Sequence, residues 1–219
     1  MNWALKYWNS SVGKKALMAI TGIIGLGFTF VHMSGNLLVY AGRDALNAYA
    51  AALKATPPLL WGTRVVLLLA VLLHAICAIQ LYSRRADARP VKYQRPGNIQ
   101  SSLASRTMHF SAAFLVFFIL YHLAHFTWGN AHPNFNKTDV YANVVSGFQV
   151  WYVSAFYILC MVALGMHLWH GSWSFLSSLG INHQKYNLAF RRLGKLIALA
   201  IVVGNISIPV SVLTGLIKA

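Results

Sequence analysis

The sequence predicts an all-α integral membrane protein, a bundle of five transmembrane helices. Of its 219 residues, 58% are hydrophobic and only 10% are charged, which is too little polar surface to solvate a compact soluble domain. In addition, five stretches are long enough to cross a hydrocarbon core of about 30 Å, which takes about 20 mainly apolar residues. These stretches are residues 16–40, 59–82, 108–128, 148–175 and 196–217.

The long apolar runs predict helices, because unpaired backbone groups are costly in lipid and barrel strands would alternate with a period of two. The first run is expected to stay as a helix rather than be cleaved as a signal peptide. It is long, follows Trp3 and Trp8, and lacks a small-residue cleavage site. We expect residues 1–219 to form a single transmembrane domain.

Two of the connecting segments have a local pattern. Between residues 42 and 58, apolar side chains such as Leu46 and Tyr49 recur at helical spacing, which predicts a short helix lying in the membrane interface. Residues 129–139 contain Pro133 and several Asn, a composition typical of an exposed turn.

The formal charge of +15 would favour a nucleic-acid partner in a soluble protein, but in a membrane protein the sorting of basic residues decides the orientation. Thirteen Lys and Arg fall on the side of the N-terminus: Lys6, Lys14, Lys15, Arg84, Arg85, Arg89, Lys92, Arg95, Arg106, Lys185, Arg191, Arg192 and Lys195. The opposite side has five: Arg43, Lys54, Arg64, Lys137 and Lys218. We therefore expect a cytoplasmic N-terminus, an outer C-terminus, and a basic inner surface that faces anionic lipid and can dock a cytoplasmic protein, with no nucleic acid.

Histidines are concentrated in the first four spans, and the fifth has none. Seven of them lie within or at the edges of the spans: His32, His74, His109, His122, His125, His167 and His170. Polar side chains inside lipid are costly, so each one needs a reason. Any single histidine could simply donate to a backbone carbonyl and join two helices.

The depths of four histidines pair them. His32 lies about 25 Å along the first helix from its inner end, and His122 about 24 Å along the third, so both are expected in the outer half. His74 lies about 15 Å before Arg84 on the second helix, and His167 falls late in the fourth, so both are expected in the inner half. Two imidazole pairs from facing helices predict two haem b groups held by axial histidines.

Three competing interpretations are weaker. A structural zinc site needs four closely spaced ligands, and Cys77 and Cys160 are read as packing residues. A proton relay through buried acids is disfavoured, since the chain has no Glu and its three Asp fall in connections. His109 and His122 on one helix could ligate two stacked haems, but the fourth helix lacks histidines at matching spacing.

Short motifs along nearly the whole chain resemble the single-chain, five-helix, di-haem cytochrome b membrane anchors of succinate dehydrogenase and fumarate reductase. The matching stretches are Ser10–Lys15, Met18–Gly22, His32–Leu37, His74, Tyr121–Leu123 and His167–Phe175.

The resemblance implies that His74 and His167 bind the inner haem iron, while His32 and His122 bind the outer one. It implies an electron-transfer subunit without succinate chemistry of its own, in a bacterial inner membrane and its respiratory chain. The expected partners are a flavoprotein and an iron–sulfur subunit on the cytoplasmic side, membrane lipid and a quinone, with menaquinone expected. A higher oligomer of the whole complex is compatible with it.

The quinone site is open from sequence. Related anchors place a hydroxyl and a cation at the start of the first helix, which makes Ser11 and Lys15 candidates, although a helix cap followed by a surface lysine explains them equally well. His170, one turn from His167, is a further candidate for contact with a quinone or a haem propionate.

Two other classes of function stay open from the residues alone. A haem b anchor of a hydrogenase or formate dehydrogenase would also carry basic inner loops and helix-borne histidines. A non-redox membrane protein could use histidines only to join helices, and it would contain no haem.

Overall fold

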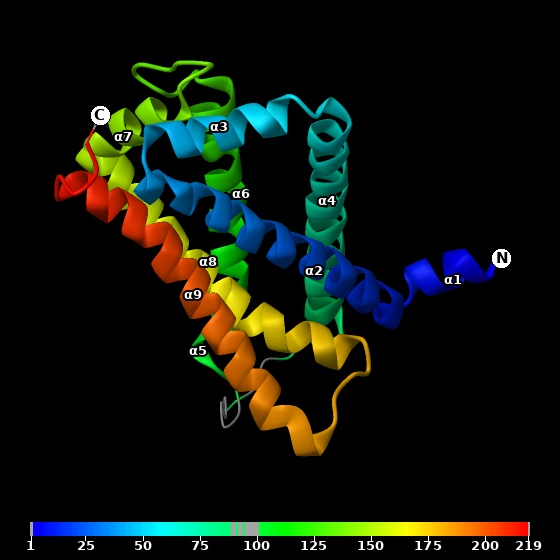
Figure 1. Ribbon diagram of the computed structural model, residues 1–219. Helices are drawn as coiled ribbons and strands as arrows, with labels where there is room; N and C mark the ends of the chain where they lie inside the picture. The colour runs from blue at the N-terminus through cyan, green and yellow to red at the C-terminus, as the bar shows by residue number, and fades with distance from the viewer. Residues whose placement is uncertain (1, 89–90, 92–93, 95–100, 219) are drawn as a thin grey trace.

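The computed structural model describes residues 2–88, 91, 94 and 101–218. The predicted inner basic residues Arg89, Lys92 and Arg95 lie outside the described part. The elements, in chain order, are α1 (Trp3–Asn9), α2 (Ser11–Asn36), η1 (Leu37–Ala41), α3 (Arg43–Lys54), α4 (Pro57–Asp87), α5 (Leu103–Arg106), α6 (Met108–Leu123), η2 (Ala124–Trp128), α7 (Val140–Gln149), α8 (Trp151–Ser178), η3 (Gln184–Tyr186) and α9 (Asn187–Leu213). Figure 1 shows this all-helical arrangement, and the described residues contain no strand.

The five predicted spans are confirmed. Among the described residues, five helical segments are long and apolar enough to cross a membrane: Ser11–Ala41, Pro57–Arg85, Met108–Trp128, Trp151–Ser178 and Gln184–Leu213. The chain is therefore a multi-pass membrane protein with an all-α fold.

The last span begins earlier than the apolar pattern predicts. The sequence favours a start at residue 196, whereas α9 begins at Asn187 and carries Arg191, Arg192 and Lys195 in its first turns. A helix satisfies its own backbone hydrogen bonds and does not need lipid to continue. The basic side chains can extend away from the apolar stem to water, so the helix runs past the apolar segment.

The fourth span begins later than predicted, because the chain bends at Val150. This residue has an extended backbone (φ −76°, ψ 103°) between α7 and α8. The Ser154 hydroxyl donates to the carbonyl of Phe148 at 2.6 Å and Val153 N donates to Val150 O at 3.0 Å, which satisfies groups freed at the break. The predicted start at residue 148 joins two helices that the structure separates.

The predicted helix between residues 42 and 58 is confirmed as α3. Gly42, with φ +97°, makes the sharp turn from η1, a conformation that favours glycine. Leu46 on α3 is buried, and the helix packs against α7 and η1.

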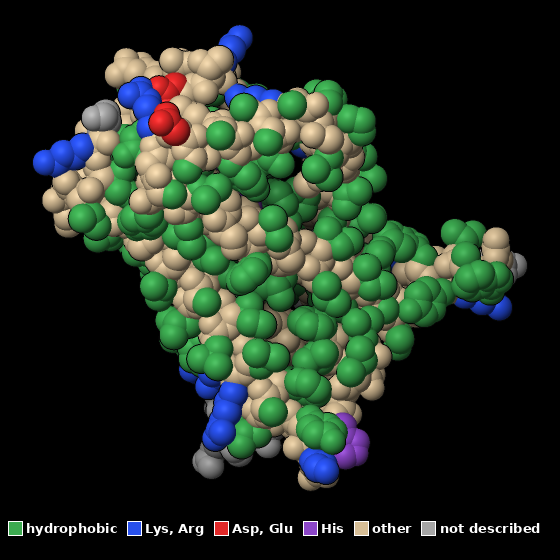
Figure 2. Space-filling view, viewed as in Figure 1, with side chains coloured by type: hydrophobic (Ala, Val, Ile, Leu, Met, Phe, Trp, Pro, Cys, Tyr) green, Lys and Arg blue, Asp and Glu red, His purple; other side chains and the backbone are tan. Residues whose placement is uncertain are grey.

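The helices form a bundle in which α2 is central. It packs against α4 on one side and against α8 and α9 on the other, while α8 and α9 pack along each other (Figure 1). We name the two ends of the bundle by their elements: the α3–α7 end, which includes residues 129–139, and the α5–η3 end. Figure 2 shows hydrophobic side chains over the middle of the visible face and basic side chains toward the ends.

Candidate functional site

Four histidines from four different helices meet two by two. The ring centres of His32 on α2 and His122 on α6 are 5.8 Å apart, with 85° between the ring planes. The ring centres of His74 on α4 and His167 on α8 are 6.2 Å apart, with 56° between the planes. The structure thus brings together the same partners that helical depth pairs.

The two pairs lie at different heights in the bundle. The Thr21 hydroxyl of α2 is 3.2 Å from His74 Nδ1, and His32 lies eleven residues further along the same helix. Eleven residues correspond to a rise of roughly 16 Å along a helix axis. The His74–His167 pair is therefore nearer the α5–η3 end, and the His32–His122 pair nearer the α3–α7 end.

The His74 ring is held in one orientation. Its Nδ1 lies 3.0 Å from the Met18 carbonyl oxygen. A carbonyl only accepts, so Nδ1 carries the proton and Nε2 keeps its lone pair. Gly22 permits this approach, since a Cβ there would lie 3.3 Å from His74 Cε1.

The partner of His74 is also enclosed by protein. His167 Nδ1 is a buried nitrogen without a hydrogen-bond partner among the described residues. One turn further along α8, His170 is half-buried. It follows His167 toward the α5–η3 end.

Aromatic rings surround the other pair. Phe28 stacks on His32 with ring centres 5.3 Å apart, and Phe118 lies 5.6 Å from His122. The Tyr157 hydroxyl is 3.4 Å from His122 Nδ1. His122 is half-buried, whereas His32 is exposed at the side of the described chain.

Each pair brings two imidazole rings together. The described residues contain no group of three or more His, Cys, Asp or Glu placed to hold a metal ion. A metal bound between either pair would take its remaining ligands from a group other than these side chains. His109 does not join either pair: its ring lies against that of Tyr82, with centres 4.1 Å apart and 59° between the planes.

The candidate quinone residues Ser11 and Lys15 are both exposed at the start of α2. The cap of this helix is Ser10, whose Oγ accepts from Gly13 N at 2.9 Å and donates to Tyr7 O at 2.7 Å. The capping alternative therefore applies to Ser10 rather than to Ser11.

Lys14 is a buried cation that the sequence reasoning missed. Only 2% of the residue is exposed, and its Nζ donates to Gln80 Oε1 at 2.5 Å. The same Nζ lies 4.5 Å from the centre of the Trp8 ring. The sequence offers one signal for this contact, the spacing along α2 and α4. Lys14 precedes Met18 by one helical turn, and Gln80 follows His74 by six residues.

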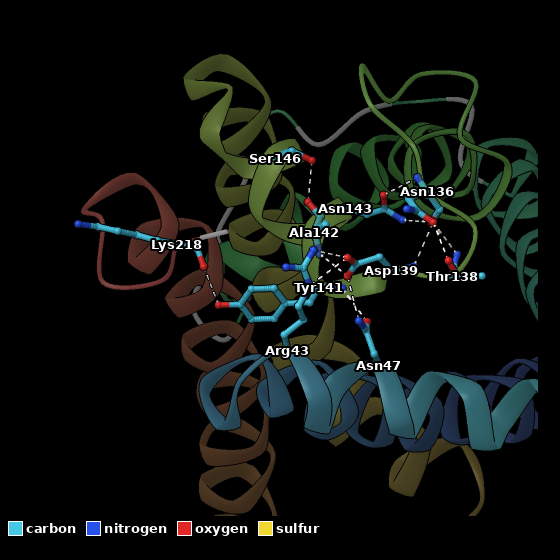
Figure 3. A network of polar contacts seen from close by, with 10 residues as sticks. All are labelled: Arg43, Asn47, Asn136, Thr138, Asp139, Tyr141, Ala142, Asn143, Ser146 and Lys218. Carbon is cyan, nitrogen blue, oxygen red and sulfur yellow. Dashed lines mark hydrogen bonds and ion pairs between the residues drawn. The ribbon is translucent and has the colours of Figure 1, made fainter.

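A polar network joins the elements of the α3–α7 end (Figure 3). The Asp139 carboxylate accepts from the Arg43 guanidinium, from Asn47 Nδ2 at 2.9 Å and from Ala142 N at 3.0 Å. Residues 129–139 are thereby attached to both α3 and α7. Hydrogen bonding from Arg43, followed by that from Asn47, lowers the pKa of Asp139 to about 2.

The turn at residues 129–139 is more ordered than an exposed turn. His132 is buried, and its Nε2 donates to the Asn143 carbonyl at 2.9 Å. Asn143 Nδ2 in turn donates to Asn136 O at 2.7 Å, and Asn136 N donates to Asn143 Oδ1 at 2.8 Å. This segment lies at the α3–α7 end of the bundle, where the His132 ring stacks on His125 with ring centres 4.8 Å apart.

Comparison with known proteins identifies the family. The family model described as "Succinate dehydrogenase/Fumarate reductase transmembrane subunit" matches residues 89–205, just over half of the chain and including His122 and His167. Neither the curated proteins nor the solved structures gave a match. The chain belongs to the family of transmembrane subunits of succinate dehydrogenase and fumarate reductase.

Proposed function

We propose that this membrane anchor holds two haem b groups, one between His32 and His122 and one between His74 and His167. Through them it passes electrons between an iron–sulfur subunit and a membrane quinone. One observation carries the proposal: four imidazoles from four membrane-spanning helices meet in two separate pairs. Family membership implies that the anchor has catalytic partner subunits. It also favours this function over that of a hydrogenase or formate dehydrogenase anchor.

The spacing of the pairs fits a group that needs two axial ligands. An imidazole nitrogen binds a metal at about 2 Å, so two imidazoles on opposite sides of one metal have ring centres roughly 6 Å apart. The observed separations are 5.8 Å and 6.2 Å. A haem would bring the remaining metal ligands itself, so a pair of histidines would suffice to hold it.

The side chains have defined tasks in this proposal. Haem, when bound, supplies the one-electron chemistry of its iron. The Met18 carbonyl fixes the protonated nitrogen of His74, which leaves Nε2 free to bind metal. Phe28 and Phe118 provide an apolar shell beside the other pair. Such a shell controls the local dielectric and water access.

The basic α5–η3 end is the proposed cytoplasmic docking surface. Arg84, Arg85 and Arg106 lie at this end, together with the first turns of α9. With this end inside, the N-terminus is cytoplasmic and the C-terminus is outside, in a bacterial inner membrane. Ser11, Lys15 and His170 remain the candidate contacts for a quinone on this inner side.

The test is the haem content of single variants of the complex, purified with its partner subunits. We expect two haem b per wild-type chain, and the loss of about one when any of His32, His74, His122 or His167 is replaced by alanine. The His32 and His122 variants should share one spectral defect, and the His74 and His167 variants the other.

His109→Ala is the matched control, because His109 lies on α6 but its ring contacts Tyr82 rather than a histidine. It should keep both haems. A wild-type complex without haem b, or one of the four alanine variants that retains two, would contradict the proposal.

A further inference from the structure

The Tyr157 hydroxyl on α8 lies between two histidines of the third span. It is 3.4 Å from His122 Nδ1 and 3.1 Å from His125 Nδ1. Tyr157 is 5% exposed and His125 is fully buried. Water is therefore largely excluded as a competing partner for the Tyr157 hydroxyl and the His125 ring.

Aromatic side chains enclose this hydroxyl from several elements. The rings of Phe118, Phe126 and Phe148 each lie 5.0–5.8 Å from the Tyr157 ring. They come from α6, η2 and α7. The packing fixes the phenol where it can reach both imidazoles.

If His122 binds a metal through Nε2, the donors and acceptors along His122, Tyr157 and His125 follow in a single direction. A ligating Nε2 must carry a lone pair, so Nδ1 carries the proton and donates to the Tyr157 oxygen. The single Tyr157 proton is then donated to His125 Nδ1. His125 must hold its own proton on Nε2, which is a buried nitrogen without a partner among the described residues.

The neighbouring His132 does not extend the chain. Its ring stacks on His125 with centres 4.8 Å apart, but both of its nitrogens are already used. Nε2 donates to Asn143 O at 2.9 Å, and Nδ1 accepts from Asn134 N at 3.1 Å. The hydrogen-bond chain therefore ends at His125.

The local backbone is adapted to bring His125 to this place. His125 lies in η2, a single turn of π-helix that follows α6. Such turns are rare and occur often at functional sites. A Cβ on Gly147 of α7 would lie 2.9 Å from His125 Cε1, so only glycine lets α7 pack this closely.

We propose that Tyr157 is a positioning residue for His122, and that the chain His122–Tyr157–His125 sets the orientation and the donor strength of that one haem ligand. This inference rests on the proposed function. The other pair is built differently, because His74 is held by a backbone carbonyl. The two haems thus differ in the group that supports a ligand, and Tyr157 acts on one of them alone.

The test is the redox titration of the purified complex carrying Tyr157→Phe. A hydrogen-bond acceptor at Nδ1–H raises the basicity of a ligating imidazole, and a more basic ligand favours oxidised iron. Removing the hydroxyl should raise the midpoint potential of the His32–His122 haem and leave that of the His74–His167 haem unchanged. The low-spin electron paramagnetic resonance signal of the same haem should shift.

Tyr121→Phe is the matched control. The Tyr121 ring lies 6.0 Å from that of Tyr157 and stacks on His125, yet its hydroxyl makes no hydrogen bond among the described residues. Both potentials should stay at the wild-type values. As a second variant, His125→Phe keeps an aromatic ring but removes the acceptor of the Tyr157 proton, and should give a smaller shift in the same direction.

The outcomes separate this inference from the proposed function. If wild-type protein holds two haems and Tyr157→Phe leaves both potentials and both signals unchanged, the positioning role is wrong and the haem assignment stands. Equal shifts in Tyr157→Phe and Tyr121→Phe, or in both haems, also overturn it. Absence of haem from the wild-type complex overturns the proposed function itself.

Discussion

The Asp139 carboxylate links residues 129–139 to two helices, α3 and α7. It accepts from α3 through Arg43 and Asn47, and it caps α7 by accepting from Ala142 N. Its pKa, at about 2, lies below the ordinary value for Asp of about 3.9. A carboxyl with a depressed pKa stabilises the folded state above its ordinary pKa, and the contribution is lost as the pH falls through the folded value.

We therefore predict that Asp139→Asn lowers the Tm of the detergent-solubilised protein, by roughly 2–4 °C at neutral pH. The difference from wild type should be constant above about pH 5 and should shrink to zero only below about pH 2, as measured in thermal unfolding scans across this range. Asp44→Asn is the control, since Asp44 is exposed on α3 and its side chain makes no hydrogen bond among the described residues. A difference that keeps its full neutral-pH size at pH 2 would refute the assignment.

Which histidines meet could be predicted from the sequence, but not what surrounds them. Depth along a helix follows from counting residues, so His32 and His122 could be matched, as could His74 and His167. The Tyr157–His125 link depends on the rotation of α8 against α6 and on a π-helical turn. Neither leaves a mark in hydropathy, and the same holds for the burial of Lys14.

Close packing between α8 and α9 depends on small residues. A Cβ on Gly165 of α8 would lie 2.6 Å from Val202 Cγ2 of α9. Valine is stiff in a helix and cannot easily turn away. We predict that Gly165→Ala destabilises the protein by about 1–3 kcal/mol through overpacking.

Gly171→Ala on the same helix gives the comparison. A Cβ at Gly171 meets no atom within 4 Å, so the substitution should be neutral or stabilise α8 by up to roughly 1 kcal/mol. Unfolding in a denaturant series would measure both variants. Equal effects would mean that helix propensity, rather than the α8–α9 contact, decides the outcome.

Glycines on α2 show why such contacts are hard to predict from sequence. A Cβ added at Gly22 would meet His74, and one at Gly35 would meet the Tyr49 ring of α3. A Cβ added at Gly25 or Gly27 would meet no atom within 4 Å. All four are on one apolar helix, and only its rotation in the bundle distinguishes them. Element boundaries show the same limit, since hydropathy locates the apolar segment and not the helix that extends beyond it.

The molecule as a whole is a bundle with an outward-facing apolar surface and two unlike ends. Exposed large hydrophobic side chains run along the spans, as expected where lipid is the solvent. At the α5–η3 end, Arg191 lies 4.5 Å above the Trp173 ring and Lys195 lies 4.9 Å from Trp169. Cations paired with Trp are typical of the membrane interface.

This unequal distribution of charge predicts the orientation in the membrane. Because basic residues are retained in the cytoplasm, the α5–η3 end should face inward and the α3–α7 end outward. A single cysteine at Lys137 should react with a membrane-impermeant maleimide in intact cells lacking the outer membrane, and one at Gln184 only after lysis. Both positions are exposed.

The native cysteines do not interfere with this labelling. Cys77 and Cys160 are both free and fully buried, so the unmodified chain gives the background level. Labelling of Gln184→Cys in intact cells, together with protection of Lys137→Cys, would reverse the orientation. In that case the proposed docking surface at the α5–η3 end would face away from the cytoplasm, and a cytoplasmic partner subunit would have to approach the less basic α3–α7 end instead.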